Sequence, residues 1–114
     1  MRLEPMDLYH TTDIDGISLL NPDADALRAL LASLDEPAAR EADHPDVALI
    51  HDPSGWSISV FPGGTVTLEN LEAEDGSPLY MNAVSRQEAL QLWLELAQGE
   101  IECVRDRPWI SSQD

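Results

Sequence analysis

One stretch of the chain decides the fold: Gly55-Trp56-Ser57-Ile58-Ser59-Val60-Phe61-Pro62-Gly63-Gly64-Thr65-Val66-Thr67-Leu68-Glu69. Two alternating segments flank a Pro-Gly-Gly turn, a pattern typical of a β-hairpin. If Gly63 and Gly64 alone formed the turn, Phe61 would face Val66, and each face would mix apolar with polar side chains. If residues 62–64 form the loop, Phe61 faces Thr65 instead, and the two kinds of side chain separate.

The second register gives the hairpin one apolar face and one polar face. The apolar face carries Trp56, Ile58, Val60, Val66 and Leu68, and the polar face carries Ser57, Ser59, Thr65, Thr67 and Glu69. Since a slip of one residue would invert the buried face, we expect this register. Proline at the first corner of a type I turn, followed by a left-handed glycine, fits the loop.

Two helices are predicted around the hairpin. Ser85-Arg86-Gln87-Glu88 matches a capping box and opens a helix that Gly99 closes. Its apolar side should lie on the inner face of the hairpin. The other helix begins at Asn21-Pro22-Asp23, ends near Asp35, and carries an apolar stripe of Ala24, Leu27, Leu31 and Leu34.

Further strands are expected at residues 3–10, 17–20, 47–51, 79–84 and 101–104. Pro5 places the first at a sheet edge, and the third is apolar on both faces. In the fourth, Leu79, Met81 and Ala83 should point inward. The sequence thus predicts an α+β fold, with an antiparallel sheet of about four to six strands and two main helices, the C-terminal one packed on the sheet. Residues 1–114 should form a single domain.

The charge balance is strongly acidic. Asp and Glu number 22 against 6 Lys and Arg, which gives a net charge of −16, and every basic residue is an arginine. Such a surface repels nucleic acid and anionic membranes and attracts basic proteins. Genome composition and salt adaptation are alternative explanations of this bias. Neither a secretory signal nor a membrane-spanning segment is visible, so we expect a cytoplasmic protein.

No residue pattern indicates a metal, a cofactor or an active site. Asp13-Ile14-Asp15-Gly16 resembles the start of a calcium loop but lacks its later acidic ligands. The three histidines (His10, His44 and His51) have no metal-ligand spacing. His51 and Asp52 would suit an acid–base pair, although a strand end followed by Asp-Pro is more typical of a turn. The single cysteine, Cys103, is expected to be a small buried side chain.

The candidate partner-binding residues are mostly acidic. The loop after the hairpin is the densest acidic segment, and a second cluster follows the C-terminal helix. Trp109 is the tryptophan best placed for an exposed contact. The predicted binding residues are Glu69, Glu72, Glu74, Asp75, Glu100, Glu102 and Trp109.

The second half of the chain resembles a known family. An amphipathic hairpin, an acidic loop, a strand ending in Val84-Ser85, a helix beginning Arg86-Gln87-Glu88-Ala89, a closing Gly99-Glu100 and the late Trp109 follow in order. This order is similar to bacterial immunity proteins of polymorphic toxins, especially the family encoded beside deaminase toxins. The resemblance implies a small α+β protein that binds a cognate toxin, blocks its active site and has no activity of its own.

Two other functions fit the sequence. The first is an acidic adaptor or chaperone for a basic secreted effector, and the second is a small enzyme that uses His51 and Asp52. The sequence does not indicate an oligomeric state.

Overall fold

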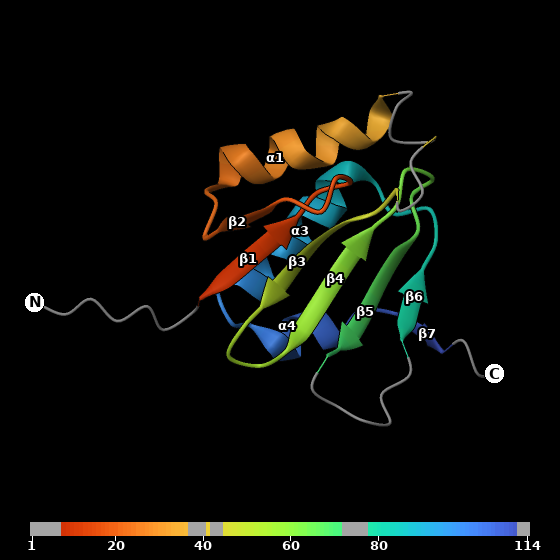
Figure 1. Ribbon diagram of the computed structural model, residues 1–114. Coiled ribbons are helices and arrows are strands. Elements are labelled where there is room, and N and C mark those ends of the chain that lie inside the picture. Colours follow the sequence, from red (N-terminus) through yellow and green to blue (C-terminus); the bar gives the residue numbers. More distant parts are fainter. Residues whose placement is uncertain (1–7, 37–40, 42–44, 72–77, 112–114) are drawn as a thin grey trace, which may run out of the picture.

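The computed structural model describes residues 8–36, 41, 45–71 and 78–111. Within them, seven antiparallel strands form one sheet in the order β2-β1-β3-β4-β5-β6-β7, with helices on one of its faces (Figure 1). The α+β class is confirmed, and the sheet has one strand more than the upper end of the predicted range. The strands are β1 (Tyr9–Thr12), β2 (Ser18–Leu20), β3 (Val47–His51), β4 (Trp56–Val60), β5 (Val66–Asn70), β6 (Leu79–Met81) and β7 (Ile110–Ser111).

The register predicted for the β4–β5 hairpin is confirmed. Ile58 lies opposite Leu68 and Val60 lies opposite Val66, and all four side chains are almost completely buried. The Phe61 amide donates to the Thr65 carbonyl oxygen at 2.9 Å, which closes the three-residue loop. Gly64, in this loop, has φ +95°, a conformation that costs glycine nothing.

The C-terminal helix α3 (Arg86–Ala97) packs on the sheet, as predicted, and it lies over β3 as well as over β4 of the hairpin. The Ser85 hydroxyl accepts a hydrogen bond from the Glu88 amide at 3.0 Å, which is the serine half of the predicted capping box. Trp93 is fully buried and donates its indole N–H to the Ile58 carbonyl oxygen at 3.1 Å. This bond ties the helix directly to the backbone of β4.

The first helix, α1 (Ala24–Ala32), continues into a short 3-10 turn, η1 (Ser33–Asp35), and packs against α3. The carboxylate that caps it belongs to Asp23, which accepts from the Ala26 amide at 2.9 Å. Asn21 has a different role. Its backbone has φ +49°, and its side-chain oxygen accepts a hydrogen bond from the Tyr9 amide. Leu27, Leu31 and Leu34 are buried, as the apolar stripe predicts.

The segment predicted as a last strand is helical. α4 (Ile101–Arg105) turns Ile101 and Val104 toward the core and leaves Cys103 exposed. Both the predicted strand at residues 101–104 and the predicted burial of Cys103 are therefore wrong. The segment is helical because Ile101 and Val104, three residues apart, then share one face, and because the segment packs on α3.

Three other strand predictions need correction. β1 lies between β2 and β3 instead of at an edge, and residues 3–7 lie outside the described residues. β3 buries one face only, since Ala48 and Ile50 are half-buried. Ala83 is exposed at φ +57°, because the chain leaves β6 after Met81 and turns toward α3.

The two faces of the sheet differ. Thr11, Leu49, Ile58 and Leu68 are successive cross-strand partners and face the helices. The neighbouring row of Thr12, Ala48, Ser59, Thr67 and Tyr80 faces the other way. Figure 1 shows no described helix over that second face.

Candidate functional site

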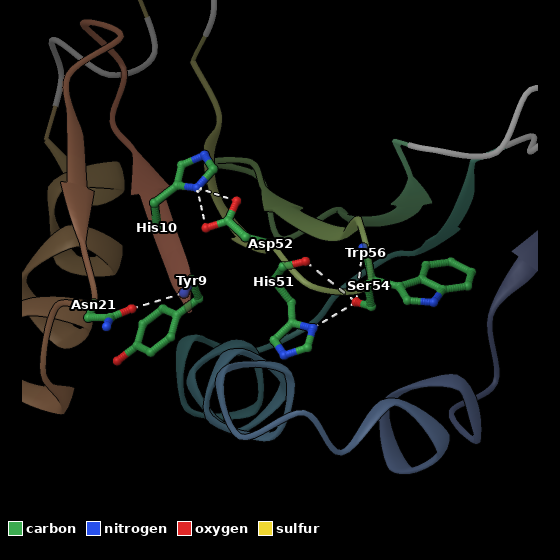
Figure 2. Close-up of polar contacts among 7 residues, drawn as sticks. All are labelled: Tyr9, His10, Asn21, His51, Asp52, Ser54 and Trp56. Atoms are coloured by element: carbon green, nitrogen blue, oxygen red, sulfur yellow. Dashed lines mark hydrogen bonds and ion pairs between the residues drawn. The ribbon is translucent and has the colours of Figure 1, made fainter. Parts of the chain in front are cut away.

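A group of polar side chains gathers where β3 ends (Figure 2). The Asp52 carboxylate lies 2.9 Å from Nδ1 of His10, which β1 brings alongside from the start of the chain. Both side chains are about one-third exposed, at 32% for His10 and 39% for Asp52. The Asp52 amide also donates to the Leu8 carbonyl oxygen at 3.0 Å, so this residue ties β3 to the beginning of β1.

His51 points to the other side of the sheet, toward the helices. It is 4% exposed, and its Nδ1 lies 2.7 Å from the Ser54 hydroxyl oxygen. That hydroxyl also accepts from the Trp56 amide at 3.3 Å, and the Gly55 amide donates to the His51 carbonyl oxygen at 2.8 Å. These contacts hold the β3–β4 turn together.

The acid–base pair considered from the sequence does not assemble around one site. Successive residues of a strand point to opposite faces, so His51 and Asp52 diverge. Asp52 pairs with His10, whereas His51 lies on the buried side of the turn and contacts Ser54. This geometry serves to close the ends of β1, β3 and β4.

Tyr9 completes the same end of the sheet. Its hydroxyl donates to the Pro22 carbonyl oxygen, which connects β1 to the start of α1. Burial, and secondarily the negative charge of Asp23, raises the pKa of Tyr9 above its ordinary value. The phenol is therefore held in its neutral, hydrogen-bond-donating form.

The short acidic turn between β1 and β2 has a structural role. One carboxylate oxygen of Asp13 accepts from the amides of Asp15 and Ile17, each at 2.9 Å. This is how an aspartate commonly closes a turn. Across the described ranges, no group of three or more His, Cys, Asp or Glu side chains is arranged to hold a metal ion.

The arginines of the described ranges all have contacts within the fold. Arg28 pairs with Asp25, Arg86 with Asp35 and Arg107 with Glu95, at N–O distances of 2.8, 3.0 and 2.8 Å. The guanidinium of Arg105 lies 5.3 Å from the centroid of the Trp56 ring. Arg86 in addition donates to the Pro62 carbonyl oxygen at 2.9 Å, which joins the hairpin loop to the helices.

The predicted partner-binding residues that the structure describes lie on different elements. Glu69 is half-buried and lies opposite Ser57 on the face away from the helices, whereas Glu100 and Glu102 are exposed at the start of α4. Trp109 is half-buried and donates its indole N–H to the Val104 carbonyl oxygen at 2.8 Å. Glu72, Glu74 and Asp75 lie outside the described residues.

Sequence reasoning missed a groove between α1 and the β1–β2 hairpin. It has a volume of about 810 Å³, with Ile14, Leu19 and Leu30 among its apolar lining residues and Asp15, Glu36 and Glu41 among its acidic ones. The sequence indicates part of this groove, because the acids of the β1–β2 turn lie close to the apolar residues 17, 19 and 20. Their meeting with α1 depends on the tertiary fold.

Comparison with models of protein families, with curated proteins and with solved structures found no match. None of the helices in the described ranges has the length and apolar character needed to cross a membrane.

Proposed function

We propose that the protein is an immunity protein, a stoichiometric inhibitor that binds and neutralises a cognate secreted bacterial toxin in the cytoplasm. The observation that carries this proposal is the distribution of charge. Every arginine of the described ranges already contacts another residue of the same chain, three of them in ion pairs and Arg105 against Trp56. With 22 Asp and Glu against 6 Lys and Arg, most of the acidic side chains cannot each be matched by a basic side chain.

The partner that suits this surface is a protein with a basic cleft. Toxins that act on nucleic acids need such clefts, because contacts to phosphates dominate their affinity. An acidic inhibitor is steered toward a basic cleft over long distances, which raises the association rate. The order of features in the second half of the chain, which resembles immunity proteins encoded beside deaminase toxins, supports the same partner.

The test begins with co-purification from the native host, followed by titration of the recovered basic protein. We expect a 1:1 complex in which the toxin's activity is lost at equimolar inhibitor. The association rate should fall strongly as salt rises, because exposed charges are screened beyond about 8 Å at physiological ionic strength. A stable complex in which the partner keeps full activity would instead identify an adaptor or chaperone.

Charge-reversal variants locate the binding surface. One variant reverses Glu72, Glu74 and Asp75 to lysine, and a second reverses Glu100 and Glu102. Reversal of Glu88 and Asp106, which are exposed outside the predicted binding set, matches the second variant in charge. We expect the first two variants to slow association more than the control does, with unchanged thermal melting. Equal association kinetics in all variants would show that these acids are merely exposed to solvent and take no part in binding.

A further inference from the structure

The edge strand β2 has an unusual surface for the margin of a sheet. All three of its residues, Ser18, Leu19 and Leu20, are exposed, and the exposed fractions of the two leucines are 53% and 69%. Ile17, directly before the strand, is 60% exposed. β2 pairs with β1 on one side and ends the order of the described strands on the other. Apolar side chains at an unpaired edge favour association with another chain.

The hydrogen-bonding pattern shows which backbone groups this edge offers. The Asp13 amide donates to the Ile17 carbonyl oxygen, and the Asn21 amide donates to the Tyr9 carbonyl oxygen. In an antiparallel pair, residues that bond to the partner strand alternate with residues that do not. Leu19, opposite Thr11, therefore bonds toward β1, while the N–H and C=O groups of Ser18 and Leu20 point away from it.

The groove beside β2 would receive the side chains of an added strand. Leu19 faces the helices and lines this groove together with Leu30 of α1. Asp15, Glu36 and Glu41, all exposed, supply its acidic lining. The groove thus combines an apolar wall with negative charge next to backbone groups that no described strand pairs.

We propose that β2 and this groove bind an extended, lysine- or arginine-containing segment of a partner protein by β-strand addition. Main-chain hydrogen bonds from Ser18 and Leu20 supply pairing, and the apolar groove and its acids select alternate side chains. A second copy of this chain is a poorer occupant, because it would bring another surface with a net charge of −16 against the same acids. The inference rests on the proposed function only in taking the basic toxin as the natural source of the segment.

The experiment uses the full chain and a heptapeptide of alternating lysine and valine, acetylated and amidated at its ends. Amide chemical shifts are followed by NMR at low salt, and amide hydrogen exchange is measured with and without peptide. We expect shifts concentrated at residues 13–20 and on α1, together with slower exchange at Ser18 and Leu20. Two control peptides carry glutamate in place of lysine, or N-methyl groups at alternate positions that prevent strand pairing.

A neutralised variant tests the contribution of the groove acids. Asp15→Asn, Glu36→Gln and Glu41→Gln together should weaken peptide binding at least about threefold, since each removes an exposed charge contact. The control Glu88→Gln and Asp106→Asn neutralises two exposed acids outside the groove lining and should have less effect per charge removed. Asp13 is left unchanged because its carboxylate holds the turn.

Each outcome decides the proposal. Peptide binding at β2 that disappears on N-methylation supports strand addition. Shifts spread over the whole surface, equal binding of the N-methylated peptide, or no shift at millimolar peptide would overturn it. If the peptide binds at β2 but the co-purified partner keeps its full activity in the complex, the docking site is supported and only the inhibitor function is refuted.

Discussion

Replacing Trp93 by phenylalanine tests how α3 is held on the sheet. The indole is fully buried, and its N–H donates to the Ile58 carbonyl oxygen at 3.1 Å. Loss of that hydrogen bond should cost about 0.5–1.5 kcal/mol. The smaller ring also leaves unfilled volume in a close-packed core, which adds about 1–2 kcal/mol. We therefore expect the free energy of unfolding to fall by about 1.5–3.5 kcal/mol, a large fraction of the 5–15 kcal/mol typical of a domain.

Urea unfolding followed by far-ultraviolet circular dichroism measures this loss without relying on the deleted fluorophore. The midpoint should fall by about 1–2 M urea if the slope is unchanged. Trp109→Phe is the matched control, because it deletes the same N–H from a half-buried ring whose hydrogen bond to Val104 is local. If Trp93→Phe cost no more than Trp109→Phe, the indole bond would not anchor α3, and our account of the helix–sheet contact would be wrong.

Three further predictions concern the hairpin loop, an ion pair and Tyr9. Gly64→Ala should lose about 1–2 kcal/mol of stability in urea unfolding because of its positive φ, whereas Gly63→Ala, with no neighbouring atom within 4 Å of its Cβ, should change it by less than about 0.5 kcal/mol. Arg86→Met should lower the free energy of unfolding by about 1–2 kcal/mol, because it removes hydrogen bonds to the hairpin loop and η1. Arg28→Met removes only an exposed ion pair and should lower the free energy of unfolding by at most about 0.5 kcal/mol. A raised pKa means that Tyr9 retains its proton more tightly in the folded protein than in the unfolded chain. The contribution of Tyr9 to stability should therefore be full below the ordinary pKa of 10.0 and should fall as the pH rises beyond it. Urea titrations on either side of that pH should show a weaker decline in stability for Tyr9→Phe than for the wild type.

Local chemistry was enough to predict the hairpin and the ends of α3. The register follows from the alternation around Pro62, Gly63 and Gly64, and the helix start follows from Ser85 and Glu88. These features depend on residues close in sequence. Their physical causes are therefore visible without the tertiary structure.

Features that depend on docking were harder to predict. Residues 101–104 are too few for periodicity to separate strand from helix, and contact with α3 decides the outcome. The divergence of His51 and Asp52 was available from the two-residue period of a strand. The true partner of Asp52, His10, is 42 residues away and depends on the β1–β3 register.

The sheet order also has a consequence for the sequence of folding events. β3, β4 and β5 are joined by short turns, whereas β1 meets β3 only after α1 and its flanking segments have been traversed. Closing that longer chain segment costs entropy before its contacts can form. We expect the three-strand meander to be structured in the folding transition state and the β1–β2 hairpin to join later. Mutations in the Pro62–Gly64 loop should then slow folding, and mutations at Tyr9 or Thr11 should mainly accelerate unfolding.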